Sequence, residues 1–561
     1  MPGHRFFNSV VDAWELAQVE LHGQVSTERI NKLRLFLEQA SLAKVLAVCF
    51  TLPLSCLLVL IGLEAIPLAS PNAGTLANYA FWFRHISTLA VLTPGILSNF
   101  RSSLPELNIS RNDMVVLSAA GSVLSGASAF AVSLLIGFPV PFTLLVSAPV
   151  WFFVIVPPTV SIYKSRLRHD PVLLRRFIRC WFIVVWFAVS VVLYPIYIFG
   201  FHHLSSVGQF FYVGLLPVLK MTGRNVISWL VGDRYDVKAE IVIFNVEVFS
   251  ALYMSVAMQN SAKLSTTLAV MAVDIVQSKV AISDINKMMR GIEQICLSSG
   301  SRRSSNFCHI IFNPDCQLTT TTPSQQLQKT QASSSRKPSS VVPTAMTTSL
   351  ILNKLPHSKR NSQIQPTLSP PVDALKHVRT SNNNSETLPA QASNAKRLKL
   401  VARKKPKSNT LPKRKQLAEK SARVLFTAEF VLLVKYVEAI TPAIYAAFVG
   451  IAFSLSNRKY YNQFDAITSD NLDNTIMNVL LYCLLKTLSF CVLCFTLSRR
   501  LGISAIHLVT FVLINQWEAV LSKILTWVVY TTLTSLKHSG TGYLQCTNKL
   551  QCNLNVAIAR T

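Results

Sequence analysis

"MVVLSAAGSVLSGASAFAVSLLIGFPVPFTLLVSAPVWFFVIVPPTVSIY", residues 114–163, contains no charged side chain. A helix needs about 20 apolar residues to cross the roughly 30 Å hydrocarbon core of a bilayer. The segment GFPVPF at 137–142 divides this run near its middle, because proline cannot donate a backbone hydrogen bond and breaks the helical pattern. The stretch therefore predicts two membrane-spanning helices joined by a tight turn.

The composition of the whole chain is typical of a membrane protein. Half of the 561 residues are hydrophobic, 14% are charged, and the mean hydropathy is +0.38. A soluble chain of this length is more polar. The net charge of +28 is unevenly distributed, since residues 302–423 hold 22 Lys and Arg against 4 Asp and Glu. The protein is therefore basic because a polar insert separates its apolar blocks.

Other apolar segments extend this prediction to an all-α polytopic bundle of about 11 transmembrane helices, with a range of 9–11. Five segments have few or no charges: 45–63, 180–201, 424–455, 476–497 and 503–536. Four are shorter or carry charges: 77–97, 207–219, 241–258 and 264–276. The predicted parts are an N-terminal cytoplasmic segment at 1–42, a first membrane domain of about eight spans at 43–290, a basic insert at 298–421, a second membrane domain of about three spans at 424–536 and a tail at 537–561.

Basic loops predict the orientation of these spans, because loops rich in Lys and Arg stay on the cytoplasmic side. The loop KSRLRHDPVLLRR at 164–176 is the strongest marker. With eleven spans it falls on the same side as the insert and as four other basic residues, Lys220, Arg224, Arg499 and Arg500. We therefore expect the N-terminus in the cytoplasm and the C-terminus on the opposite side.

The insert at 298–421 is rich in Ser, Thr, Pro, Gln and Asn, and it holds too few apolar residues to form a core. We expect it to be a disordered cytoplasmic loop. Its basic segment fits a nuclear import signal, a nucleic-acid contact or a juxtamembrane contact with anionic lipid. The membrane spans favour the lipid contact, made by Lys404, Lys405, Lys407, Lys413, Arg414 and Lys415. We expect no nucleic-acid binding, because no aromatic residue that could stack on bases lies between Phe312 and Phe426.

Basic residues precede serine at several positions of the insert, as basophilic kinases prefer. The candidate phosphosites are Ser305, Ser362 and Ser408. Each phosphate would add about −1.5 to −2 charges and weaken the attraction to anionic lipid. Such patterns also arise by chance in a stretch rich in Ser and Lys.

Five ionisable residues within the predicted spans form a candidate polar pathway: Glu247, Asp274, Lys435, Glu438 and Glu518. An ionised group in lipid is costly, so it normally faces a partner or a water-filled cavity. One interpretation is a path for an ion, a proton or a solute. The other is that these residues form structural ion pairs between helices, or that their long side chains reach the membrane interface.

Small residues recur at four-residue spacing between 118 and 129. Small side chains let helix backbones approach closely in a membrane. This pattern predicts a tightly packed central helix.

The sequence has no Walker A loop, no zinc-protease His-Glu-x-x-His and no Gly-x-Ser-x-Gly elbow. Cys491 and Cys494 form a CxxC pair inside a predicted span, where two packed thiols are expected rather than a zinc or redox site. We therefore expect no catalytic residue, no metal and no cofactor.

Several segments resemble a family of multi-pass membrane proteins in Phytophthora and related oomycetes. They include LEAIPLASPNAGTLANYAFWFRHIS at 63–87, AEIVIFNVEVFSALYMSVAMQ at 239–259 and FVLINQWEAVLSKILTWVV at 511–529. The resemblance covers both apolar blocks but not the insert, and it implies a membrane location and an oomycete source without implying a reaction. Lys435 stands where the resemblance leads us to expect an acidic residue, which argues against an essential charge at that position.

Two functions agree with these features. The first is a transporter or channel, in which the five ionisable residues line the path. The second is a non-transporting receptor or scaffold whose basic loop binds anionic lipid or partner proteins. An intramembrane enzyme is a more distant third, and layout alone does not imply function.

Overall fold

The computed structural model describes residues 18–205, 208, 211–212, 214–260, 264–298, 307, 311–312, 410–465, 469–533 and 535–540. Within these residues the chain is helical and forms no β-sheet, which confirms the prediction of an all-α fold. Most of the basic insert and most of the C-terminal tail lie outside the described residues.

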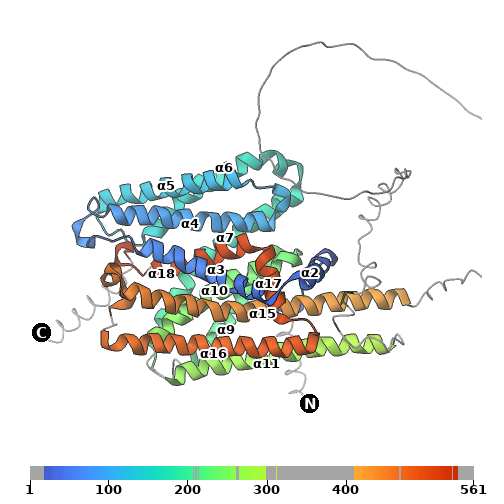
Figure 1. Ribbon diagram of the computed structural model, residues 1–561. Helices are drawn as coiled ribbons and strands as arrows, with labels where there is room; N and C mark the ends of the chain where they lie inside the picture. Colours follow the sequence, from blue (N-terminus) through green and yellow to red (C-terminus); the bar gives the residue numbers. More distant parts are fainter. Residues whose placement is uncertain are drawn as a thin grey trace, which may run out of the picture. The chain divides into compact units, whose positions relative to one another are not determined.

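The helices form two groups by sequence, one before the insert and one after it (Figure 1). The first group comprises α2 (Thr27–Gln39), α3 (Leu42–Glu64), α4 (Tyr79–Ser103), α5 (Arg111–Ile136), α6 (Thr143–His169), α7 (Pro171–His203), α9 (Leu215–Val231), α10 (Tyr235–Asn260) and α11 (Leu264–Ser298), preceded by a short 3₁₀ turn, η1 (Val19–Leu21). The second group comprises α15 (Thr410–Phe453), α16 (Ser469–Leu501), α17 (Ala505–Asn515) and α18 (Trp517–Leu533).

Six helices are long and apolar enough to cross a membrane, which supports a multi-pass membrane protein. They are α3, α5, α6, the first part of α7, nearly all of α10 and α16 from Ile476 onward. A seventh span is formed if α17 and α18, which are bent by 88° at the break between them, count as one. The eleven spans expected from the sequence are not confirmed, because α4, α9, α11 and α15 do not belong to this set.

Successive helices run in opposite directions, so that their connections gather at two ends of the bundle (Figure 1). Ion pairs tie one end together. Glu518, at the start of α18, lies 3.2 Å from Arg101 and 2.5 Å from Arg111, and Glu106 pairs with Arg234. The basic α6–α7 connection lies at the same end, which we call the basic end.

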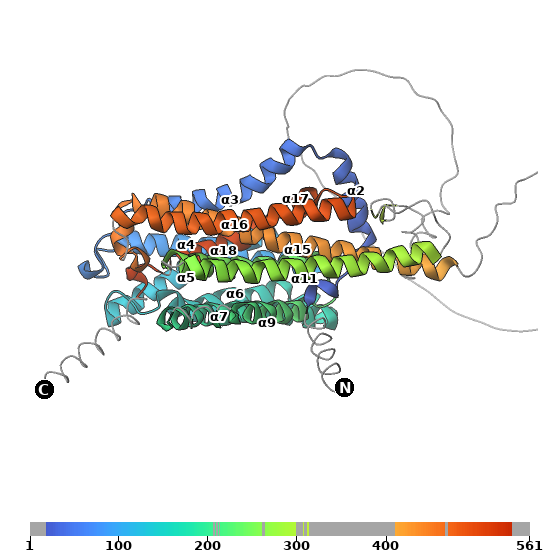
Figure 2. The ribbon, with the colours of Figure 1, turned by 90° about the horizontal axis from the view of Figure 1, so that it is seen from below.

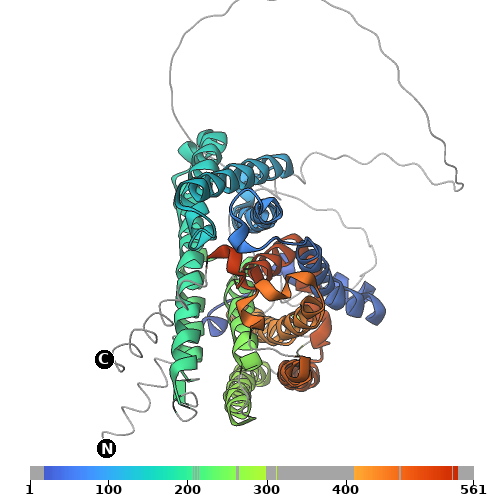
Figure 3. The same cartoon turned by 90° about the vertical axis from the view of Figure 1, so that its left-hand side faces the viewer.

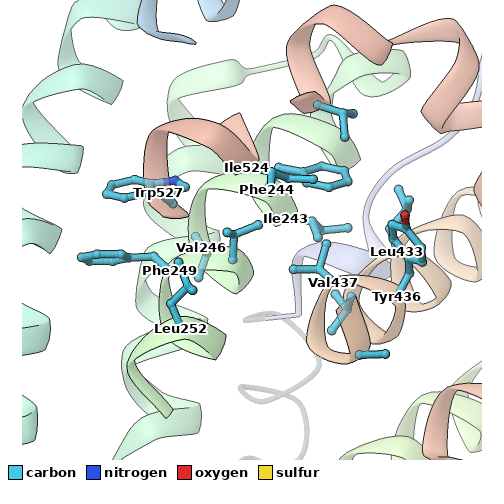
Figure 4. Packing of buried hydrophobic residues seen from close by; sticks show 14 of the residues in the cluster. Ile243, Phe244, Val246, Phe249, Leu252, Leu433, Tyr436, Val437, Ile524 and Trp527 are labelled. Carbon is cyan, nitrogen blue, oxygen red and sulfur yellow. The ribbon is translucent and has the colours of Figure 1, made fainter. Parts of the chain in front are cut away.

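Helix α10 is the central helix of the fold, although its sequence contains two glutamates and predicts one of the less apolar spans. It carries apolar residues on every side, and a helix of that kind is stable only when it is surrounded by others. Phe249 packs on Trp527 of α18 with ring centroids 4.3 Å apart, and Ile243 faces Val437 of α15 (Figure 4). Both groups of helices therefore contribute to one core.

Figure 3 shows the second group end-on in orange and red, with helices of the first group beside it. This arrangement follows from the position of α10, which belongs to the first group by sequence and packs between α15 and α18 of the second. The insert consequently interrupts the sequence of a core that is continuous in space.

Helix α5, which the spacing of small residues predicts to be central, lies at the edge of the bundle. Its glycines do permit close approach, because a Cβ on Gly121 would meet Ile155 of α6 and a Cβ on Gly126 would meet Ile86 of α4. Its opposite face, including Val123 and Leu135, is exposed. The prediction of a central helix is therefore wrong, because small residues mark close contacts with particular neighbours, here α4 and α6, and not burial on all sides.

Gly95 lies where α4 crosses α18, and it provides a test of this packing. A Cβ at Gly95 would lie 2.0 Å from the Thr526 Oγ1 atom and 3.0 Å from the Ser522 carbonyl oxygen. We expect Gly95→Ala to lower the free energy of unfolding by about 1–3 kcal/mol through overpacking. The measurement is the thermal unfolding midpoint of the purified protein in detergent.

The matched control is Gly62→Ala in α3, because a Cβ at Gly62 meets nothing within 4 Å. Alanine favours helices over glycine by up to about 1 kcal/mol, so this variant should be unchanged or slightly more stable. Equal midpoints for the two variants would contradict the close approach of α4 and α18.

Candidate functional site

The candidate site is a network of buried charged side chains contributed by five helices. Its members are Lys220 and Arg224 of α9, Glu247 of α10, Asp274 of α11, Lys435 and Glu438 of α15, and Lys486 of α16. We call this set the charge network. Ionised groups are costly to place among apolar side chains, so the arrangement is stable only if each group has partners of opposite charge.

Local helix geometry brings several of these residues to common faces. Residues three or four positions apart are neighbours on a helix surface. Lys220 and Arg224 are four apart on α9, and Lys435 and Glu438 are three apart on α15. Each helix therefore presents its charges on a single side, where neighbouring helices can match them.

Glu438 is at the centre of the charge network. Its Oε1 atom lies 2.9 Å from Lys220 Nζ, and its Oε2 atom lies 3.0 Å from Lys435 Nζ and 3.1 Å from Lys486 Nζ. One carboxylate thus receives hydrogen bonds from three ammonium groups. These bonds connect α15 to α9 and to α16.

Asp274 forms the second anionic position of the network. Its Oδ1 atom accepts hydrogen bonds from Lys435 and, at 2.6 Å, from Lys486. The hydroxyl of Ser489, one turn after Lys486 on α16, donates to Oδ2 at 2.9 Å. Asp274 and Glu438 therefore share the same two lysines, which draws α11, α15 and α16 together.

Glu247 forms the third anionic position, next to α9. Its Oε1 atom accepts from Arg224 Nε at 2.8 Å and lies 2.6 Å from Arg224 Nη2, while its Oε2 atom lies 2.9 Å from Lys220 Nζ. A hydrogen bond in which both groups are charged is stronger than one between neutral groups. The side chain of Glu247 is completely buried.

The charge network holds one more cation than carboxylates. Its side chains are four bases and three acids, all buried except the partly exposed Arg224, whose side chain is 19% exposed. Glu20 of η1 approaches this arginine from the N-terminal segment, with its Oε1 atom 3.9 Å from Arg224 Nη1. The network therefore has a formal charge of +1 before this distant carboxylate is counted.

A cavity of about 440 Å³ borders the charge network between α9, α11 and α15. Lys220, Arg224 and Lys435 line it together with two carboxylates, Glu20 of η1 and Asp284 of α11, and the other lining residues are mostly apolar. Figure 2 shows α11 running between α16 and the pair α7 and α9. The buried charges are thus in contact with a space large enough for a small molecule, since such pockets usually measure about 300–1,000 Å³.

Four of the five candidate pathway residues, Glu247, Asp274, Lys435 and Glu438, lie together in the charge network. Glu518 lies apart from them at the basic end, where its partly exposed side chain pairs with two arginines.

Lys220, Arg224 and Lys486 were not among the candidate pathway residues. The sequence places Lys220 and Arg224 in a cytoplasmic loop, but the structure places both inside the bundle on α9, so they cannot serve as markers of orientation. Their four-residue spacing in the run LLPVLKMTGRNVISWLV is the signal that predicts a shared helical face.

Other buried ion pairs are separate from the charge network. Glu240, seven residues before Glu247 on α10, pairs with Lys523 of α18. Glu64 pairs with Arg84, and the Tyr461 hydroxyl joins both at 2.5 Å. These pairs bind helices to one another in closed surroundings.

Several predictions concern residues that the structure describes only in part. Lys404, Lys405, Lys407 and the candidate phosphosites Ser305, Ser362 and Ser408 lie outside the described residues, and the side chains of Lys413 and Arg414 do too. Lys415 is exposed on α15, 3.9 Å from Glu419. Cys491 and Cys494 are free thiols on α16, and among the described residues no group of His, Cys, Asp and Glu has the arrangement of a metal site.

Comparison of the chain with protein families, with curated proteins and with solved structures finds no match. The resemblance to oomycete membrane proteins therefore stays a prediction. The function has to be argued from the charge network and its surroundings.

Glu438 allows a direct test of the charge network. Removing one member of a buried, hydrogen-bonded charge group typically costs about 3–5 kcal/mol, because its partners are left buried and unpaired. Glu438→Gln should therefore lower the thermal unfolding midpoint in detergent strongly, or prevent accumulation of the protein.

Glu518→Gln is the matched control, since the ion pairs of Glu518 are partly exposed and such pairs contribute about 0–1 kcal/mol. This variant should unfold close to the wild-type temperature. A Glu438→Gln protein as stable as Glu518→Gln would show that the network is hydrated or that its charges are not mutually satisfied.

Proposed function

We propose that the protein is a transporter or channel in which the charge network forms part of the path of a charged solute. The observation that carries this proposal is the contact between the network and the cavity of about 440 Å³. A purely structural cluster of ions needs no adjoining space. A conducting or transporting site needs a space where a solute exchanges hydrogen bonds with buried charges.

The separate ion pairs provide the comparison within the same molecule. Glu240 with Lys523 and Glu64 with Arg84 are as deeply buried as the charge network, yet none of the four lines this cavity. Structural pairing therefore suffices for these residues. The three cations that face the cavity are the ones for which a further role is proposed.

We also propose that the chain crosses the membrane eleven times, with the basic end in the cytoplasm. The alternating directions of α3 to α11 and of α15 to α18 support this number if α17 and α18 together make one crossing. Lys and Arg concentrated at one end support the orientation, since basic connections are retained in the cytoplasm.

A non-transporting receptor or scaffold is the second candidate, and one feature of the structure favours it. Helices α11 and α15 contain 35 and 44 residues. At 1.5 Å per residue they are roughly 50 and 65 Å long, more than a bilayer of about 40–45 Å requires. Both extend past their neighbours at the basic end (Figure 2), where α15 leads into the basic segment that would bind anionic lipid or partner proteins.

The orientation is testable with one exposed asparagine from each end, Asn72 and Asn112. Each is replaced by Cys in a variant that lacks the 11 native cysteines. An impermeant maleimide should label Asn112→Cys only from the cytoplasmic face of sealed vesicles of known sidedness, and Asn72→Cys only from the other face. Labelling of both from one side would overturn the proposed orientation.

Val434 allows a test for a water-filled path, because it is an apolar residue that lines the cavity next to Lys435. A small anionic thiosulfonate reagent should modify Val434→Cys in the cysteine-free protein. Val437→Cys, one turn further along α15 and packed in the core, should be protected and serves as the control. We expect rates that differ by about tenfold or more, since only a hydrated thiol ionises and reacts readily.

Equal protection of both cysteines would remove the support for a path. The charge network would then be interpreted as structural ion pairing, and the receptor or scaffold function would be preferred.

A further inference from the structure

We propose that the cavity between α9, α11 and α15 binds an anionic amphiphile, a molecule with one carboxylate or phosphate group and an apolar chain. This inference rests on the proposed function, because it names the class of solute that would reach the charge network. Binding is nevertheless measurable at equilibrium, without any transport.

The charge of the cavity selects an anion. Three cations, Lys220, Arg224 and Lys435, line it together with two carboxylates, Glu20 and Asp284, which leaves one excess positive charge in the lining. An excess positive charge in apolar surroundings is unfavourable, and an anion entering the cavity would neutralise it. Arg224 is the most exposed of the three lining cations, and its Nη1 atom, which takes no part in the contact with Glu247, can donate to a carboxylate or phosphate.

The remaining walls of the cavity select an apolar chain. Pro217 and Met221 of α9, Val273 and Val276 of α11, and Val431 of α15 contribute to the lining. A small hydrophilic anion would leave this apolar surface without a partner. A chain attached to the anionic group would cover it, and each buried methylene contributes about 0.8 kcal/mol.

The cavity opens toward the apolar perimeter of the bundle along α11. Val276 lines the cavity, yet it is 59% exposed, and Val280, one turn further on, is 36% exposed. An amphiphile dissolved in the bilayer could therefore enter sideways between α9 and α11. Its anionic group would lead toward Arg224 while its chain stayed in apolar surroundings.

The N-terminal segment places a carboxylate of its own at the edge of this cavity. The Glu20 side chain lies 3.9 Å from Arg224, and the Thr427 hydroxyl of α15 anchors the Glu20 carbonyl oxygen at 2.7 Å. The distance is longer than a hydrogen bond, so Glu20 balances the arginine only in part. A ligand carboxylate would compete with Glu20 for the same guanidinium. Asp284 of α11, the second carboxylate of the lining, lies 3.8 Å from Lys287.

The test is equilibrium binding of radiolabelled dodecanoate to the purified full-length protein in a neutral detergent. We expect saturable binding, displaced by dodecyl phosphate, but not by dodecanol or by inorganic phosphate at the same concentration. Displacement by dodecanol would show that the charge is irrelevant, and displacement by inorganic phosphate would show that the chain is irrelevant. Either result would overturn the proposal.

Two tryptophan variants on α11 locate the site. Val276→Trp fills the cavity from its exposed edge and should weaken dodecanoate binding by about tenfold or more. Ile275→Trp is the control, because Ile275 is similarly exposed, at 49%, and does not line the cavity. Both substitutions replace exposed residues, so both proteins should fold. Equal binding to the two variants would mean that dodecanoate partitions elsewhere, and the proposal would fail.

Glu20→Gln separates this inference from the proposed function. Removing the competing carboxylate should strengthen dodecanoate binding several-fold, and weaker binding would contradict the assigned position of the anionic group. Saturable, Val276-dependent binding together with a protected Val434→Cys would support the site and overturn the path. A reactive Val434→Cys without dodecanoate binding would support the path and overturn the class of solute.

Discussion

The carboxylate of Glu438, bound by three lysines from three different helices, is the interaction on which the rest of the structure depends. An ionised group inside a bilayer has no water to stabilise it, so its partners must come from neighbouring helices. Lys220 and Lys486 supply them, and they can do so only if α9 and α16 pack against α15, whereas Lys435 is a neighbour of Glu438 on the same helix. Asp274 then adds α11 by sharing two of the same lysines. Hydrophobic attraction between helices is weak in lipid, which leaves such polar contacts to specify the arrangement.

Helix α10 connects the charge network to α18. Glu247 and Glu240 lie seven residues apart on the same helix, and they bind different partners, α9 in the first case and α18 in the second. Around these two positions α10 is apolar on all sides and packs against both sequence groups (Figure 4). The polar contacts determine which helices meet, and the apolar contacts fill the space between them. The cavity lies where this filling is incomplete, beside three of the four cations.

The two ends of the bundle differ in a way that agrees with a membrane orientation. Arginines of several connections share Glu106 and Glu518 at the basic end. At the opposite end Asn457 binds the carbonyl oxygens of Glu64 and Ile66, and an ion pair between Lys537 and Asp465 joins two connections. A surplus of positive charge on one side is what retention of basic connections in the cytoplasm produces.

The sequence by itself determined the class of the protein, because the apolar side chains of long uncharged runs such as 114–163 are stable only in a bilayer or in a large apolar core. It also identified four members of the charge network, since a charge within a span requires a partner. Only the tertiary structure decided which partners these are. Helical spacing relates residues of one helix, such as Lys435 and Glu438, but gives no information on which face of α9 or α16 will oppose them. Glu518 shows the same limit, because the 88° bend before α18 carries it from a predicted span to the basic end. The central position of α10 was likewise a tertiary outcome, because a helix with two glutamates is buried only when neighbouring helices neutralise both.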